Sequence, residues 1–369
     1  MHFNTVMKVL IISDAQSVHT QRWVSSLSEK GVEVVLYSIK PYLDDFYSSR
    51  NIKCYFFDLF SYKREKTGLS GALKRHFKAV KHLKKVIREV KPDILHAHYV
   101  TSYSLIAALS GFHPLIVSIW GSDVYIFPKQ LKINELIVRY TLHKADVVLS
   151  TSHVMAKEAS KYTDKDIQIT PFGVDTELFH RSVAPPKDKF IIGSVKTLSY
   201  KYGTEYLIRA FKLVVEKNPH LDLYLELVGK GPDEKKLKNM AHELGISDKV
   251  IFTGYIRNDI LPKIFDRFSV ACYMSLSESF GVSAIEAMAC NCPVVTSDAD
   301  GFTEVVENGV TGLIVPKYDY RAAAEAIQAF IDDPSKIITM GMAGRERVAS
   351  LYQWSDNVDT MISIYKSIL

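Results

Sequence analysis

Two glutamates, with seven residues between them, stand on either side of a tight turn that leads into a predicted helix. Glu278 precedes the turn at Gly281, and Glu286 lies about one helical turn beyond Val282. The first backbone N–H groups of a helix have no partner within it, so a helix start binds anions. Such amides between two carboxylates suit a ligand with a diphosphate in its middle and hydroxyl-rich sugars on either side. The alternative is a helix cap beside a solvated charge, because strand–loop–helix units are common.

A pair of lysines forms a second candidate group. Lys196 and Lys201 lie in a loop, residues 193–203, that leaves another predicted strand. Lysines there can pair with a diphosphate as point charges and stabilise the negative charge that grows on a nucleotide leaving group. The alternative is an ordinary pair of solvated lysines, since exposed lysines are common.

Polar and aromatic residues also follow predicted strands in the first half of the chain. His19 lies in a loop that leads into a helix, and His96 and His98 end a strand. We expect these last two imidazoles to point to opposite faces of the sheet, with His98 toward the site. Trp120 ends a further strand, as a ring that stacks on a sugar or as a structural tryptophan. The candidates that follow it are Gly121, Ser122 and Asp123.

The elements that must position these residues alternate between short aliphatic runs and helical periods, which indicates parallel sheets with crossover helices. The first series of predicted strands comprises residues 7–12, 32–37, 94–96, 115–119, 147–151 and 167–170. The second series comprises residues 190–195, 221–228, 250–253, 270–273, 294–296 and 312–315. Two doubly wound α/β sheets are the simplest account, and ligands of such sheets bind beyond the carboxyl ends of the strands.

The break between the two series lies at residues 170–175, where proline and glycine interrupt any regular element. We predict a first domain at residues 1–172 and a second at residues 173–354. The final segment, 355–369, is a predicted helix that could return across the first domain.

Composition excludes several classes of protein. The 369 residues are 47% hydrophobic and 24% charged, ordinary values for a globular protein. No apolar run approaches the ~18 to 20 residues of a spanning helix, and the N-terminus lacks the pattern of a signal peptide. Four scattered cysteines predict neither a disulfide framework nor a zinc site, which favours a reducing cytoplasm. Asp298 and Asp300, with Ala299 between them, match a short metal-binding pattern but have no further oxygen ligands, so we predict no metal.

Positive charge is concentrated in one segment. Residues 1–172 carry 24 basic and 15 acidic side chains, and residues 63–91 alone carry 11 basic and two acidic ones. Apolar residues recur there every three or four positions, which predicts a helix at residues 70–90. This helix is either an ordinary solvated helix or one that binds an anionic bilayer, where each basic residue contributes about 1 kcal/mol. No stacking aromatics are interleaved with the charge, so we predict no nucleic-acid partner.

The second half of the chain, from about residue 165 to 355, resembles the donor-binding half of family 4 of the retaining glycosyltransferases, which have the GT-B fold. The segments that carry the resemblance are 172–175, 228–232, 252–254, 278–289, 293–295 and 304–313. The first half matches more loosely, as an acceptor-binding domain would. The resemblance implies two Rossmann-like α/β domains that face an interdomain cleft.

The resemblance also implies roles for the candidate residues. Glu286 would bind the ribose of the donor, and Glu278 would bind the hydroxyls of the donor sugar. Further donor contacts would come from Phe280, Gly281, Val282, Gly254 and Arg257. The family usually has an arginine and a lysine where this chain has Lys196 and Lys201, and a histidine where it has Trp120.

We therefore predict a retaining hexosyltransferase that moves a sugar from a nucleotide diphosphate donor, with UDP the expected nucleotide. The predicted acceptor is a glycan or lipid-linked intermediate of the cell envelope, and helix 70–90 is the predicted peripheral contact with the cytoplasmic face of the membrane. No covalent nucleophile is evident, so attack would be assisted by the departing phosphate, without a cofactor or metal. The alternatives are a soluble small-molecule glycosyltransferase, a nucleotide-sugar 2-epimerase and an inactive nucleotide-sugar-binding homologue.

Overall fold

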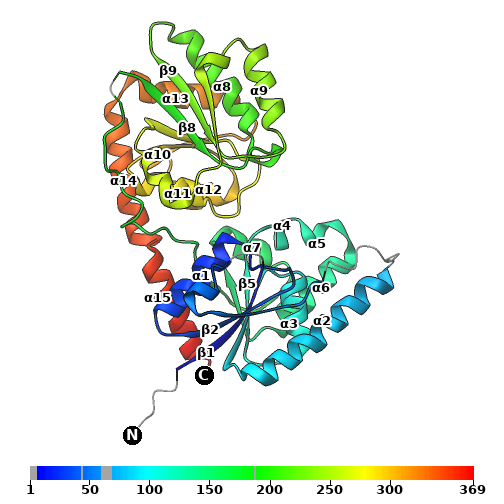
Figure 1. Cartoon of the computed structure of the whole chain (residues 1–369). Helices are drawn as coiled ribbons and strands as arrows, with labels where there is room; N and C mark the ends of the chain where they lie inside the picture. The colour runs from blue at the N-terminus through cyan, green and yellow to red at the C-terminus, as the bar shows by residue number, and fades with distance from the viewer. Residues whose placement is uncertain (1–5, 43–44, 60–68, 187) are drawn as a thin grey trace. The chain divides into compact units, whose positions relative to one another are not determined.

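The chain forms two compact units in the computed structural model (Figure 1). The model describes residues 6–42, 45–59, 69–186 and 188–369. Unit 1 extends to Thr170 and also contains Val358–Leu369, whereas unit 2 is Pro171–Asn357. Helix α15 (Trp354–Ser367) therefore begins in unit 2 and ends in unit 1.

Unit 1 is built on a parallel sheet of seven strands in the order β3-β2-β1-β4-β5-β6-β7. The strands are β1 (Lys8–Ile12), β2 (Glu33–Ser38), β3 (Lys53–Phe56), β4 (Ile94–His98), β5 (Leu115–Ile119), β6 (Val147–Ser150) and β7 (Ile167–Ile169). Strands β4 and β5 are buried along their whole length, as expected of central strands covered by helices on both faces. Strand β3 is an addition to the predicted series.

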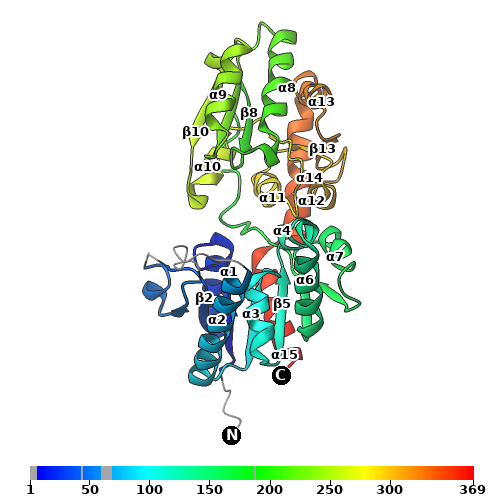
Figure 2. The same cartoon turned by 90° about the vertical axis from the view of Figure 1, so that its right-hand side faces the viewer.

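Helices cover both faces of this sheet. One layer consists of α2 (Leu69–Val90), α3 (Ser102–Ser110) and α6 (Lys132–Lys144), which lie side by side with α3 in the middle (Figure 2). Helix α1 (Val18–Glu29) and the end of α15 lie on the other side of the sheet (Figure 1). The shorter elements are η1 (Ser48–Arg50), α4 (Ser122–Tyr125), α5 (Phe127–Gln130) and α7 (His153–Ala159).

Unit 2 contains a parallel sheet of six strands in the order β10-β9-β8-β11-β12-β13. The strands are β8 (Phe190–Val195), β9 (Leu223–Val228), β10 (Val250–Gly254), β11 (Val270–Tyr273), β12 (Val294–Ser297) and β13 (Gly312–Val315). The helices are α8 (Thr204–Lys217), α9 (Glu234–Glu243), α10 (Leu261–Phe265), α11 (Val282–Ala289), α12 (Asp300–Val305), α13 (Tyr320–Asp332) and α14 (Ser335–Leu351). The short 3₁₀ turns are η2 (Tyr200–Tyr202), η3 (Ser247–Lys249) and η4 (Asn258–Ile260). The prediction of two parallel, doubly wound α/β sheets is confirmed.

Each unit has its own apolar core. In unit 1, Leu83 of α2 and Leu142 of α6 belong to the cluster that covers Val117 of the sheet. In unit 2, Phe211 of α8 and Phe330 of α13 belong to a second cluster. Full burial of one such side chain contributes about 1.5–3 kcal/mol. Within the described ranges, no helix combines the length and apolar character needed to cross a membrane.

Candidate functional site

The strand order of unit 2 changes direction between β8 and β11, which places a crevice-forming switch point at their carboxyl ends. Lys196 follows β8, and Glu278 lies in the loop after β11. Lys196 Nζ donates to Glu278 Oε2 at 2.7 Å, and the two side chains are only 11% and 10% exposed. Each charge depends on the other, because an unpaired charge at such burial is costly. An anionic ligand that reached Lys196 could replace the carboxylate of Glu278 as the partner of the ammonium group.

The second lysine approaches the ring of Tyr202, as Lys196 does. Lys196 Nζ lies 4.9 Å and Lys201 Nζ 5.3 Å from the centroid of this ring, within the range of a cation–π interaction. The carbonyl of Lys201 accepts a hydrogen bond from Leu276 N at 2.8 Å, which ties η2 to the loop after β11. The sequence analysis did not select Tyr202 as a site residue. The signal that could have found it is an aromatic residue directly after Lys201.

Glycines allow the loops at this edge to pack backbone against backbone. Gly203 follows Tyr202 with φ +61°, and a Cβ there would lie 1.9 Å from the carbonyl oxygen of Met274. Gly229, after β9, has φ +140°, and a Cβ there would lie 2.0 Å from the carbonyl oxygen of Lys196. The loops after β8, β9 and β11 are therefore held in mutual contact.

The helix after β11 begins at Val282, as the sequence predicts, with Gly281 as its N-cap residue. Phe280 is 1% exposed and anchors the preceding turn in the interior of unit 2. The carbonyl of Glu278 accepts a hydrogen bond from Gly301 N at 3.0 Å, which joins this turn to α12. The first turn of α11 thus begins at Val282, four residues after Glu278.

Glu286 is buried within α11, with 6% of its surface exposed. Its Oε1 accepts a hydrogen bond from Asn258 Nδ2 at 3.0 Å, so a residue that follows β10 orients this carboxylate. Gly254 ends β10. Arg257 is directed elsewhere: its side chain is 74% exposed and its Nε donates to Asp259 at 3.0 Å. Glu286 is therefore held by a neighbouring loop, whereas Arg257 is paired with Asp259 at the surface.

In unit 1, His96 and His98 point to the same face of the sheet, so the expectation of opposite faces is wrong. Residues two apart on a strand share a face, and these two rings are 4.6 Å apart between centroids. His98 Nδ1 lies 3.2 Å from Ser13 Oγ. His96 Nδ1 and Nε2 each lie 2.7 Å from a hydroxyl, those of Tyr365 and Ser118. Burial lowers the pKa of His96 to about 3 and that of His98 well below its usual value, so both rings are neutral at pH 7.

Trp120 joins the histidines at the carboxyl edge of this sheet. Its ring centroid is 4.4 Å from that of His98 and 6.0 Å from that of His19. Tyr99 lies 6.3 Å from the same ring, and its hydroxyl is 2.7 Å from Ser122 Oγ at the start of α4. Three of the sequence candidates, from the ends of β4 and β5 and the start of α1, therefore form one aromatic group.

Asp123 has a different environment, because it is completely buried. Its carboxylate accepts backbone hydrogen bonds from Val100 N at 2.9 Å, Gly121 N at 2.6 Å and Trp120 N at 3.3 Å. Burial raises the pKa of Asp123, and these hydrogen bonds oppose the rise. The carboxylate therefore fixes the turns after β4 and β5, and the structure gives it a positioning role in the interior.

Lowering the pH from about 7 to about 5 is expected to destabilise unit 1. An unfolded histidine takes up a proton near pH 6.5, whereas His96 in the folded state does so only near pH 3. Between these values the unfolded state binds more protons, so stability falls as the pH falls, by about 2 kcal/mol at pH 5 for this residue alone. His98 adds to the loss in the same direction. Urea denaturation of the full chain at both pH values measures the effect.

His96→Gln should reduce this pH dependence by about 2 kcal/mol, because one proton uptake is removed. The exposed His220, replaced in the same way, is the control, and its variant should keep the pH dependence of the wild type. An unchanged pH dependence in His96→Gln would contradict the assignment.

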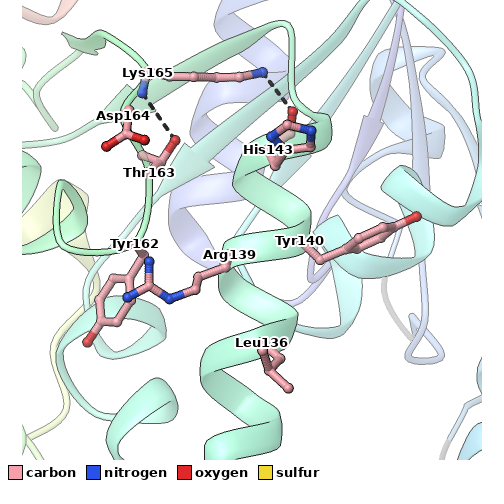
Figure 3. Close-up of a pocket in the computed structure, with 8 residues that line it drawn as sticks. All are labelled: Leu136, Arg139, Tyr140, His143, Tyr162, Thr163, Asp164 and Lys165. Atoms are coloured by element: carbon pink, nitrogen blue, oxygen red, sulfur yellow. Dashed lines mark hydrogen bonds between the residues drawn. The ribbon is translucent and has the colours of Figure 1, made fainter.

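A surface hollow of about 570 Å³ lies elsewhere in unit 1 (Figure 3). Its lining residues are Leu136, Arg139, Tyr140, His143, Tyr162, Thr163, Asp164 and Lys165. They come from α6, which ends shortly before β6, and from the segment before β7. The hollow thus lies where these strands begin, at the opposite edge of the sheet from His98 and Trp120.

Among the residues that the structure describes, no group of three His, Cys, Asp or Glu side chains is arranged to hold a metal ion. Asp298 accepts a hydrogen bond from Lys317 N at 2.9 Å. Asp300 begins α12. Cys272, Cys290 and Cys292 are buried free thiols, and burial raises their pKa.

Two family models match the chain, one for each unit. Residues 175–347 match "Glycosyl transferases group 1", and residues 8–152 match "Glycosyl transferase 4-like". Similar sequences include N-acetyl-alpha-D-glucosaminyl L-malate synthase of Bacillus anthracis, 26% identical over 75% of this chain and 75% of that protein. They also include a GDP-mannose-dependent alpha-(1-6)-phosphatidylinositol monomannoside mannosyltransferase of Mycolicibacterium smegmatis, 29% identical over 68% of this chain and 69% of that protein.

The fold is shared with solved structures of the GT-B type. The Anabaena protein HepE, solved in complex with UDP, superposes with a TM-score of 0.79 at 19% identity, over 99% of this chain and 100% of that one. This likeness concerns the arrangement of both sheets and their helices.

Proposed function

Because the chain belongs to the group 1 family of glycosyltransferases, we propose that the carboxyl ends of β8 and β11 bind the diphosphate of a nucleotide-sugar donor. The observation that carries this proposal is the nearly buried ion pair between Lys196 and Glu278 at the switch point of the unit 2 sheet. The loops around it bring two ammonium groups, a helix N-terminus and two carboxylates to one edge. A diphosphate flanked by sugars has the complementary chemistry.

Each group has a distinct task in the proposed reaction. Lys196 and Lys201 hold the diphosphate and stabilise its charge as it departs. The carboxylate of Glu278, released from its lysine, accepts hydrogen bonds from the donor sugar, and Glu286, oriented by Asn258, accepts them from the ribose. The protein contributes orientation and charge stabilisation, and the departing phosphate assists attack on its own face, so the anomeric configuration is retained.

UDP is the proposed nucleotide. The Anabaena neighbour of the same fold was solved with UDP bound, which supports a uridine donor for this chain. The sugar that we propose is transferred is a hexose.

The proposed acceptor is a lipid-linked glycan intermediate of the cell envelope, reached from the cytoplasmic face of the membrane. Its support is α2, which carries seven basic residues and one acidic residue and exposes its lysines. The name of the Mycolicibacterium relative contains a phosphatidylinositol acceptor, whereas that of the Bacillus relative contains L-malate. A small soluble acceptor is therefore the second candidate.

Thermal unfolding of the full chain with UDP-, GDP- and ADP-sugars tests the donor site. A ligand at ~100 times its dissociation constant adds about 2.7 kcal/mol to stability, and we expect a shift selective for a UDP-sugar. Incubation of the donor that binds with and without acceptor then separates the alternatives, since a 2-epimerase releases an altered sugar without acceptor. No shift with any donor would overturn the proposal. Donor binding without hydrolysis or transfer would support an inactive homologue.

A further inference from the structure

Helix α6 has an apolar face that points to solvent. Ile133, Leu136 and Tyr140 are 50%, 60% and 37% exposed, and their spacing of three and four residues places them on one side of the helix. Val138 and Leu142, fully buried in the core of unit 1, occupy the opposite side. A helix at the surface of a globular protein normally directs its apolar side to the core and its polar side outward. Helix α6 is apolar on both sides.

The apolar face continues beyond the start of the helix. Leu131, directly before α6, is 62% exposed. Leu136 and Tyr140 also line the hollow of Figure 3, which lies toward the other end of the helix. We call Leu131, Ile133, Leu136 and Tyr140 the α6 strip. Single exposed apolar residues are common on protein surfaces, whereas a contiguous set marks a contact site.

The same side of unit 1 carries a row of positive charge. Five basic residues of α2 are exposed and lie three or four positions apart: Lys74, Lys78, Lys81, Lys85 and Arg88. They lie opposite Leu83 and Val86, which are buried in the core. Helices α2 and α6 flank α3 on one face of the sheet (Figure 2), and α3 itself is largely buried. A basic row and an apolar strip therefore border the same face.

We infer that this face of unit 1 docks on an anionic bilayer, with the α2 row on the lipid headgroups and the α6 strip inserted at the boundary with the acyl chains. Basic residues beside apolar ones are the combination that binds such interfaces. A second copy of this chain is the less suitable occupant, because a two-fold contact brings the same surface of both copies together, including seven basic residues on each α2. The inference rests on the proposed lipid-linked acceptor, and it adds the apolar anchor.

The two parts of this surface respond differently to salt. Salt screens the attraction of the α2 row for lipid phosphates but leaves the insertion of the α6 strip in place. Binding to anionic vesicles should therefore weaken at high salt without disappearing.

Flotation of the full chain with phosphatidylcholine vesicles, with and without phosphatidylglycerol, tests the inference at low and high salt. Leu136→Glu should weaken binding to the anionic vesicles at least about tenfold at both salt concentrations. Lys78→Ala with Lys81→Ala should weaken it about thirtyfold at low salt, at about a tenfold effect per 1.4 kcal/mol. Met342→Glu, at a 61% exposed apolar residue of α14 in unit 2, is the matched control and should bind as the wild type does.

Three outcomes would overturn the inference: no flotation of the wild type at either salt concentration, equal flotation of Leu136→Glu and the wild type, or a dimer in sedimentation that Leu136→Glu converts to monomers. The donor-dependent thermal shift is measured on the same samples. Failed flotation with an intact donor shift overturns membrane docking alone. A missing donor shift overturns the proposed function, whatever the vesicles show.

Discussion

Replacing Glu278 by alanine is expected to lower sugar transfer by at least about 100-fold, the effect of removing one preorganised electrostatic contact from an active site. The carboxylate is proposed to bind the donor sugar, and it also holds Lys196 Nζ at 2.7 Å. Without it, the side chain of Lys196, only 11% exposed, loses its partner and has to turn to other partners or solvent. Steady-state transfer rates with a saturating donor measure the effect.

The substitution Glu278→Gln removes the negative charge of the side chain but keeps its shape. The amide oxygen can still accept a hydrogen bond from Lys196, so the loop should remain in place while the negative charge is lost. We expect this variant to be as inactive as the alanine variant. The control is Glu234→Ala, which breaks a 2.6 Å ion pair with Lys238 on the surface of α9 and should leave transfer unchanged. Full activity in either Glu278 variant would refute the proposed role.

Gly203→Ala is expected to destabilise unit 2 by roughly 3 kcal/mol or more and to weaken donor binding with it. A Cβ at this position would lie 1.9 Å from the carbonyl oxygen of Met274, so either η2 or the end of β11 has to move. Overpacking of this kind typically costs about 1–3 kcal/mol, and the left-handed backbone adds about 1 kcal/mol. Because η2 carries Lys201, the lysines lose their common position. Urea denaturation and donor-dependent thermal shifts measure both effects.

Gly245→Ala is the matched control for this experiment. Gly245 has φ +66°, close to the +61° of Gly203, but a Cβ there would have no atom within 4 Å. Its alanine variant should therefore lose only the conformational part, about 1 kcal/mol, and keep donor binding. Equal losses in the two variants would show that the contact with Met274 is unimportant.

The sequence was most informative where strands are buried on both faces. The aliphatic runs of β5, β8 and β11 have the predicted bounds, because a strand covered by helices on both sides must be apolar along most of its length. Strand β3 was missed because it is an edge strand: Lys53 and Phe56 are exposed, and its two middle residues are half-buried. Such a segment has no hydrophobic signature and depends on its pairing with β2.

The candidate site was predictable as far as it follows local motifs. Glu278 and Glu286 belong to one strand–loop–helix unit, so their spacing in the sequence predicts where they lie relative to each other. The partners contributed by other loops could not be predicted, because they depend on how strand ends meet across the sheet. Asn258 reaches Glu286 from after β10, and Tyr202 joins two lysines from within η2. The contacts of Asp123 were equally unpredictable, since its carboxylate lies in the interior and accepts hydrogen bonds from backbone N–H groups of two different turns.

The path of the chain between the two units has a consequence for the order in which they can be completed during synthesis. His96 is made early, but the hydroxyl of Tyr365 at its Nδ1 is supplied 269 residues later, after the whole of unit 2. Domains generally fold as they leave the ribosome, N-terminal first. A newly made unit 1 therefore has an open flank beside its buried histidines while unit 2 is already folding. The nascent chain exposes that flank to chaperones or proteases until α15 reaches it, which makes the last helix the step that finishes the first unit.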